Sequence, residues 1–211
     1  MLEGDDLRRF DKILSTARSV RRRIDFARPI ERDVILDCID VATQAPTGAG
    51  GESWRFVVVD DAEIKASLAA VYGDVLMEFA RERRVELKSS HRAMLDRLHE
   101  FPAMVFVCMT TQPQPNVAGQ TAFYGSILPA AWSLMLVLRA RGIGATWTTL
   151  LSARQADVAE ILGIPSGASQ VVMLPIGYTK DAVLRRAERA PAQTVTSWNR
   201  WGWKEADLEV D

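Results

Sequence analysis

Apolar residues recur at helical spacing in the first part of the chain. Within residues 5–17 every third or fourth position is apolar, which predicts a helix with one apolar stripe. Residues 31–43, which follow Pro29, carry a wider apolar face and predict a second helix. The arginine-rich stretch between these two segments predicts a loop.

Four later segments are short and rich in β-branched or other apolar residues, a composition typical of strands. They are WRFVVVDD at 54–61, FPAMVFVCMTT at 101–111, ATWTTL at 145–150 and SQVVMLPIGYT at 169–179.

Helical patterns separate these predicted strands. Residues 62–72 predict a helix, and the charged stretch 77–100 predicts one or two helices with a solvated face. Residues 121–142 are too long and apolar for a strand, so we expect a buried helix that is bent at Pro129. In the next helix Ser152 is the expected N-cap, with Gln155 completing a capping box.

The order of elements shows no internal repeat and no linker. It predicts one domain of the α+β or α/β class with a small mixed sheet.

Composition narrows the class of protein. The 211 residues carry 26 Lys and Arg against 27 Asp and Glu, and this near-neutral balance argues against general nucleic-acid binding. We find no run of about 20 consecutive apolar residues that would span a bilayer. The amino end, MLEGDDLRRF, lacks the apolar core of a signal peptide, so we expect a cytoplasmic protein that does not bind membranes.

Cysteine and histidine give little sign of chemistry. Cys38 and Cys108 lie in apolar stretches and are expected to be buried. His91 and His99 are eight residues apart in a charged segment, which does not suit a metal site. The sequence also contains no GxGxxG, GxxxxGK[ST], HExxH or GxSxG motif.

Three stretches remain as candidates for binding. RSVRRR, at 18–23, places four arginines within six residues, as a phosphate site requires, although a solvated basic turn explains the cluster equally well. APTGAGG, at 45–51, lets the backbone approach a flat ring or an anion, or is a plain turn. RGIGATWTTL, at 141–150, is either a segment whose backbone faces a ligand or a tight connection between a helix and a strand.

The tail is the last unusual feature. Three of the six tryptophans lie within residues 198–203, and exposed aromatic side chains usually have something to cover. Packing on the same domain and packing on a second subunit both remain open.

Taken together, the three candidate stretches, the long apolar helix, EILGIP and LPIGYT resemble the nitroreductase family of FMN-dependent oxidoreductases. The resemblance covers about residues 10–200 and is closest to actinobacterial members. It implies an α+β fold with a nitroreductase-like central mixed β-sheet flanked by helices. It also implies a single FMN-binding domain over 1–211 and an intertwined homodimer, in which the tail 181–211 packs on the partner subunit.

The resemblance also assigns cofactor-binding residues, which fall into three groups. The arginine motif and one tail residue hold the FMN phosphate and ribityl chain, and one of these arginines lies beside the pyrimidine edge of the flavin. The loop before Trp54 reaches the flavin from the other subunit. A strip of backbone within the predicted third strand faces the flavin ring. These residues are Arg18, Ser19, Arg21, Arg22 and Arg189; Pro46, Thr47 and Gly48; and Trp147, Thr148, Thr149 and Leu150.

The chemistry implied by the resemblance is carried by the cofactor. NAD(P)H passes a hydride to FMN, and a nitroaromatic or quinone-type acceptor is then reduced in the same cleft by a ping-pong cycle. No catalytic side chain and no metal is expected.

Departures from the family pattern leave alternatives open. Gly50 and Glu52 replace the usual Asn and Gln, Ala17 replaces an Arg, and Glu188 stands where relatives are often basic. A same-fold enzyme with other chemistry, such as dehalogenation, flavin fragmentation or use of a deazaflavin donor, is one alternative. A non-catalytic flavin-binding or sequestering protein is the other.

Overall fold

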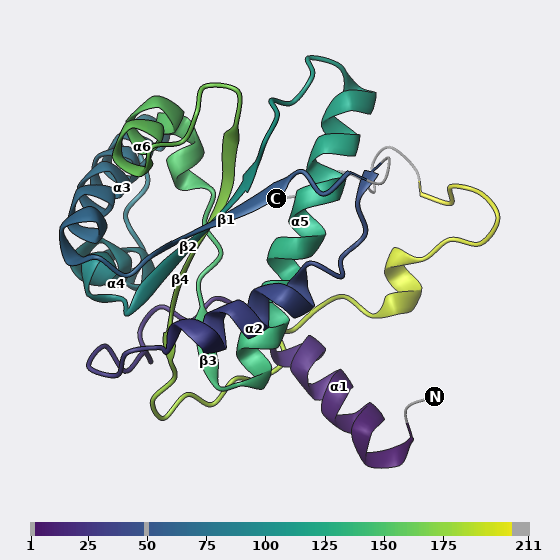
Figure 1. The fold of residues 1–211 in the computed structure, drawn as a ribbon. Coiled ribbons are helices and arrows are strands. Elements are labelled where there is room, and N and C mark those ends of the chain that lie inside the picture. Colours follow the sequence, from purple (N-terminus) through teal and green to yellow (C-terminus); the bar gives the residue numbers. More distant parts are fainter. Residues whose placement is uncertain (1–2, 49–50, 204–211) are drawn as a thin grey trace.

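The computed structural model describes residues 3–48 and 51–203, and Figure 1 shows how its helices surround a central sheet. The α-helices are α1 (Gly4–Thr16), α2 (Arg32–Ala42), α3 (Ala62–Arg83), α4 (Ser89–Arg97), α5 (Val117–Ala140) and α6 (Gln155–Leu162). The strands are β1 (Trp54–Val59), β2 (Ala103–Met109), β3 (Ile143–Ala145) and β4 (Ser169–Tyr178). Short 3₁₀ turns occupy η2 (Leu98–Glu100), η3 (Leu150–Arg154) and η4 (Ala192–Val195).

The four strands form one sheet in the order β1-β2-β4-β3. All three pairings are antiparallel, so the expected mixed sheet is corrected to an antiparallel one within the described residues. Helices α2 and α5 cover one face and α3, α4 and α6 the other, which confirms the α+β class with flanking helices (Figure 1). Every residue of the central strand β2 is buried, because helices cover both of its faces.

Helix α5 is the predicted apolar helix. By length and composition it could cross a membrane, contrary to our expectation that no segment could. In this fold it packs along the sheet and buries residues from Phe123 to Leu138, so it serves as a core helix. Pro129 lies inside it, as expected from the sequence.

The segment 145–150 differs from its prediction. Strand β3 ends at Ala145, and beyond it only Thr148 bridges Met173 of β4 before η3 begins. The capping-box prediction is also wrong, because Arg154 precedes α6. The Gln155 side chain instead binds the backbone of Gln170, accepting from its N–H at 3.2 Å and donating to its carbonyl at 2.7 Å. A tertiary contact has outcompeted the local cap.

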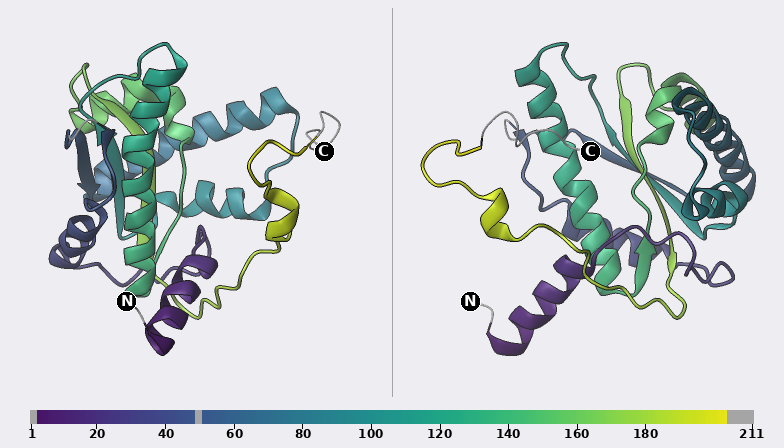
Figure 2. Two further views of the ribbon diagram at one scale, coloured as in Figure 1. Left: turned by 90° about the vertical axis from the view of Figure 1, so that its right-hand side faces the viewer. Right: turned by 180° about the vertical axis from the view of Figure 1, so that it is seen from behind.

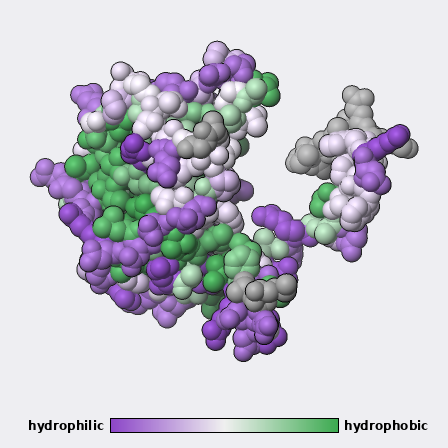
Figure 3. All heavy atoms as spheres, turned by 45° about the vertical axis from the view of Figure 1, so that its right-hand side comes forward, coloured by the Kyte–Doolittle hydropathy of each residue, from purple (hydrophilic) through white to green (hydrophobic). Residues whose placement is uncertain are grey.

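The tail leaves the body after β4 and runs outward as extended chain with one 3₁₀ turn (Figures 1 and 2). Trp198 is 85% exposed and Trp201 is 70% exposed. In the space-filling view the tail stands apart from the body across an open gap (Figure 3). Trp198 and Trp201 therefore do not pack on their own domain, which was one of the two possibilities considered from the sequence.

Candidate functional site

Two segments far apart in sequence lie side by side at the site. The Asp25 N–H donates to the Tyr178 carbonyl at 2.8 Å, and the Lys180 N–H donates to the Arg23 carbonyl at 3.0 Å. Ile24 and Thr179 form an antiparallel bridge between these two bonds. The arginine motif therefore runs antiparallel to the beginning of the tail.

Two glycines permit this close approach. A Cβ on Gly177 would lie 2.5 Å from Cγ2 of Ile24, and a Cβ on Gly144 would lie 3.0 Å from Cδ1 of the same residue. Any larger residue would therefore push the arginine motif away from β3 and β4. Gly144, the second glycine of RGIG, thus allows the arginine motif to pack closely. From the sequence we had considered only a backbone that faces a ligand or a tight helix-to-strand connection.

The arginine motif is also tied to the strip that follows β3. The Val20 N–H donates to the Ala145 carbonyl at 3.0 Å, and the Thr146 hydroxyl donates to the Val20 carbonyl at 2.9 Å. The Trp147 N–H donates to the Ser19 hydroxyl oxygen at 3.0 Å. Two stretches that the resemblance assigns to one flavin site are therefore in direct contact.

A first arginine hollow lies between the end of α1, helix α5 and the tail, with a volume of about 810 Å³. Arg18 lines it together with Arg186 and Arg189 of the tail. Glu188 is the one carboxylate in its lining. The structure thus brings Arg18 and Arg189 together, as predicted for a phosphate site, and adds Arg186.

A second arginine hollow, of about 420 Å³, follows directly along the same two segments. Ser90, at the start of α4, lines it together with the arginine motif and the first residues of the tail. Its lining is Ser19, Val20, Arg21, Arg22, Arg23, Ser90, Asp181, Ala182, Val183 and Leu184. Arg21 and Arg22 therefore lie apart from Arg18, which is a finer division than the sequence indicated.

A buried phenol lies next to Thr148 and Arg21. Tyr72 of α3 is 5% exposed. Burial raises its pKa, while a hydrogen bond with the Thr148 hydroxyl and the positive charge of Arg21 lower it in part. The phenol is therefore a neutral hydrogen-bonding group at neutral pH, next to the predicted flavin-facing strip.

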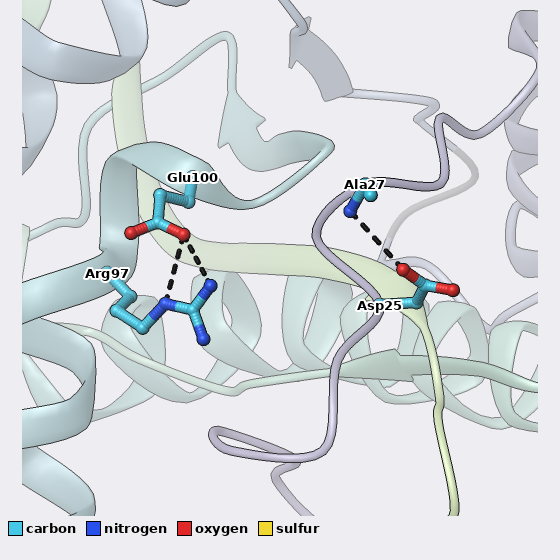
Figure 4. Close-up of polar contacts among 4 residues, drawn as sticks. All are labelled: Asp25, Ala27, Arg97 and Glu100. Atoms are coloured by element: carbon cyan, nitrogen blue, oxygen red, sulfur yellow. Dashed lines mark hydrogen bonds and ion pairs between the residues drawn. The ribbon is translucent and has the colours of Figure 1, made fainter.

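Polar contacts, drawn in Figure 4, and aromatic packing hold the segment that follows the arginine motif. The Ala27 N–H donates to the Asp25 carboxylate at 3.3 Å, which closes the turn after the motif. Arg97 donates from Nε to Glu100 at 3.0 Å and places its guanidinium 3.7 Å from the ring centre of Phe26. These contacts attach the motif to the core, because Phe26 also packs edge-on against buried Phe101.

Other predicted residues lie elsewhere. Pro46, Thr47 and Gly48 line neither arginine hollow; the Gly48 N–H instead donates to Ser126 of α5 at 2.9 Å. Gly50 falls outside the described residues.

The strip after β3 faces more than one part of the site. Trp147 and Thr149 line a third, more apolar hollow of about 440 Å³, to which Phe123 and Tyr124 of α5 contribute. The Thr148 N–H is used in the bridge to β4, donating to the Met173 carbonyl at 3.1 Å.

Sequence reasoning missed several lining residues. Arg186 belongs to the basic start of the tail, so its composition was a usable signal. Ser90 gave no signal, because its place opposite the arginine motif depends on how α4 folds back toward the sheet.

Comparison with known families identifies the fold. Residues 14–178 match the sequence model of the Nitroreductase family. The chain belongs to this family.

Individual relatives are more distant. Iodotyrosine deiodinase from Drosophila melanogaster is 27% identical over 192 residues, covering 85% of this chain and 66% of that protein. The chain thus spans just under two thirds of the fly protein. The 5,6-dimethylbenzimidazole synthase of Rhodospirillum rubrum is 28% identical over 163 residues, covering 72% of this chain and 74% of that protein.

Solved structures share the fold at low identity. Oxidized iodotyrosine deiodinase bound to FMN and 3-iodo-L-tyrosine matches with a TM-score of 0.68 and 20% identity, covering 91% of this chain and 100% of that chain. The NADPH:FMN oxidoreductase of Vibrio harveyi, complexed with NAD⁺, matches with a TM-score of 0.70 and 17% identity, covering 94% and 80%. These matches confirm the nitroreductase-like fold.

Proposed function

We propose that this protein is an FMN-dependent oxidoreductase that takes hydride from NAD(P)H and reduces a nitroaromatic or quinone-type acceptor by a ping-pong cycle. Membership of the Nitroreductase family supports this class of reaction, as do structural neighbours that bind FMN. The observation that carries the proposal is the first arginine hollow, which Arg18 and Arg189 both line.

The described residues suit FMN in charge and in order. Arg18, Arg186 and Arg189 would hold the terminal phosphate, whose charge of about −1.5 to −2 matches several guanidiniums. Ser19 and Arg21, which come next along the motif, would hold the ribityl chain and the pyrimidine edge. The strip Trp147–Leu150, already bonded to Ser19, would lie along the ring.

When bound, FMN supplies a ring that accepts hydride from NAD(P)H and passes two electrons to the acceptor. The chain's own part is to bind and orient. Arg21 would supply a fixed positive charge near the pyrimidine edge, where a reduced ring gains negative charge, and this would be preorganised electrostatic stabilisation. The Tyr72 phenol, whose pKa is raised, stays protonated at neutral pH and hydrogen-bonds the Thr148 side chain.

We also propose that a homodimer completes the site. The exposed Trp198 and Trp201 of the tail are suited to cover a second copy, and the tail 181–211 is our proposed packing segment. The loop 46–48 of that copy would reach the ring, since this loop lines neither arginine hollow of its own chain. Residues 204–211 of this tail lie outside the described residues.

Reductive dehalogenation of a halogenated aromatic substrate is the second candidate function. It is favoured because a relative of matching fold is named iodotyrosine deiodinase and binds FMN together with 3-iodo-L-tyrosine. Released halide, measured with a halogenated phenol as the acceptor, separates this reaction from nitroreduction.

The proposal is tested by colour and bleaching. Purified protein should carry one FMN per chain and bleach anaerobically on addition of NADH or NADPH. A protein that stays yellow with both would favour a non-catalytic flavin binder or another donor such as a deazaflavin. A colourless protein that FMN cannot reconstitute would contradict every flavin-based function.

The phosphate assignment has its own variants. Arg18→Ala together with Arg189→Ala should weaken FMN binding at least about a hundredfold, because charge-assisted hydrogen bonds contribute about 1.5–3 kcal/mol each. Arg9→Ala, on the exposed face of α1, is the control and should keep its flavin. Full FMN occupancy in the double variant at nanomolar FMN would contradict the assignment.

A further inference from the structure

The second arginine hollow carries more positive charge than the FMN proposal uses. Arg21 is assigned to the flavin, Arg22 was expected from the resemblance to lie near its phosphate and ribityl chain, and Arg23 has no assigned role; Arg22 and Arg23 are both exposed on the same wall. Within the part of the chain that the structure describes, neither forms an ion pair with a carboxylate. Asp181 is the one acidic residue in the lining, so the hollow keeps a net positive charge.

The opposite wall adds hydrogen-bond donors. Ser90 contributes a hydroxyl from the first turn of α4, a helix of nine residues. Lys88, the N-cap, makes no side-chain capping bond to that turn. Ser90 therefore shares the lining of this hollow with three arginines, and a hydroxyl donor beside several guanidiniums favours an anion.

The hollow adjoins residues that the FMN proposal uses. Ser19 lines it and also accepts from Trp147 of the predicted flavin-facing strip. Arg21 lines it and lies close enough to Tyr72 to influence that phenol's pKa. A volume of about 420 Å³ is within the range of small-ligand sites. A molecule stacked on the ring could extend one anionic group into this space.

We propose that Arg22, Arg23 and Ser90 form an anion subsite that selects phosphate- or carboxylate-bearing substrates over neutral ones of the same size. It rests on the proposed flavin function and extends it to substrate class. The anion has two possible sources, the 2′-phosphate of NADPH and the carboxylate of an acceptor. In a ping-pong cycle donor and acceptor occupy the same space in turn, so one subsite can serve both.

The test uses substrate pairs that differ in charge at one end. NADPH is compared with NADH as donor, and 4-nitrobenzoate with 4-nitrobenzamide as acceptor, in the flavin-loaded dimer. The test variant is Arg22→Gln with Arg23→Gln, and the matched control is Arg8→Gln with Arg9→Gln on α1. Each removes two positive charges from adjacent exposed positions, so a general change in the protein's field affects both equally.

We expect wild type to prefer the anionic member of at least one pair by about tenfold or more in kcat/KM, as one retained charge-assisted bond predicts. The test variant should lose this preference, and Arg22→Lys with Arg23→Lys should restore part of it. If only the NADPH/NADH pair shows this preference and its loss in the test variant, the anion is the donor's 2′-phosphate. If only the nitrobenzoate/nitrobenzamide pair does, the anion is the acceptor's carboxylate. Equal rates within both pairs in wild type would overturn the subsite.

Flavin content and bleaching, measured on the same samples, report separately on the proposed function. Calorimetric titration with 2′,5′-ADP against 5′-AMP, and with 4-nitrobenzoate against 4-nitrobenzamide, needs no turnover. If FMN were absent, tighter binding of an anionic member that the test variant loses would still support the subsite. Indistinguishable binding within both pairs would overturn it.

Discussion

The centre of the sheet is buried and apolar, whereas the arginine-lined rim beside it is exposed and charged. Strand β2 buries all seven of its residues, and β4 buries nine of its ten. The rim, which we define as residues 18–24 with 179–192, is largely exposed and lines two hollows between its segments. The sheet finds its packing partners within one chain, whereas the arginines of the rim form no ion pair within residues 3–48 and 51–203.

This difference separates stability from function. Buried apolar surface stabilises the fold through its own contacts, at roughly 25 cal/mol per Å². Clustered, unpaired guanidiniums stabilise nothing by themselves, so their arrangement is explained by what they bind. The rim is held in place by backbone hydrogen bonds and close packing, not by its arginine side chains.

The largest expected effect tests the sheet side of this comparison. Phe106 of β2 is fully buried in the cluster with Met173 and Tyr72. Phe106→Ala should lower the free energy of unfolding by about 3–5 kcal/mol, because the variant loses apolar contacts and leaves a cavity. Urea denaturation measures this loss. Arg22→Ala on the rim should change the same quantity by less than about 0.5 kcal/mol. Similar losses for both would remove the distinction between the two regions.

The sheet side is also what the sequence predicted well. The four strands and the long helix were found because they are rich in apolar residues at strand or helix spacing, and several of these residues pack into the core. Strand β3 was placed too late, because ATWTTL has strand composition while the strand itself ends at Ala145 and only a bridge at Thr148 follows it. A mixed sheet was expected both from the order of elements and from the resemblance, and the antiparallel pairings within the described residues correct it.

The rim was predicted in its parts and not in its geometry. The motif Arg18, Ser19 and Arg21 stood out by charge, and Arg189 entered through the family resemblance. Their division between two hollows could not be read, since it depends on pairing between positions such as Ile24 and Thr179, 155 residues apart. The place of Ser90 could not be predicted from the sequence for the same reason.

The next prediction concerns the contact between sheet and rim. Gly177→Ala puts a methyl group 2.5 Å from Cγ2 of Ile24, a stiff β-branched side chain that cannot move aside easily. We expect a loss of about 1–3 kcal/mol in unfolding free energy, as overpacking typically gives, and weaker FMN binding because the arginine motif shifts. Thermal denaturation and flavin titration measure the two effects. Gly167→Ala, where a Cβ meets nothing within 4 Å, is the control and should change neither.

The smallest expected effect lies where the rim is anchored, at Arg97 and Glu100. The hydrogen bond from Arg97 lowers the pKa of Glu100 from its ordinary 4.5. A lowered folded-state pKa adds stability that is fully present above the unfolded value and is lost as pH falls through the folded one. Because both side chains are more than a third exposed, solvent screening limits the contribution to about 1 kcal/mol or less.

Glu100→Gln should therefore cost about 1 kcal/mol or less at pH 7, and wild type and variant should converge as pH falls below 4.5. Urea denaturation across pH 3–7 measures the difference directly. Glu82→Gln is the control, since Glu82 is exposed and forms no ion pair within residues 3–48 and 51–203, and its stability at pH 7 should match that of wild type. The rim also attaches through Phe26 over Phe101, which Glu100→Gln leaves intact, so FMN affinity should not change. A variant that lost flavin would show that the ion pair itself positions the arginine motif, and the separation between anchoring by the core and binding by the rim would then be wrong.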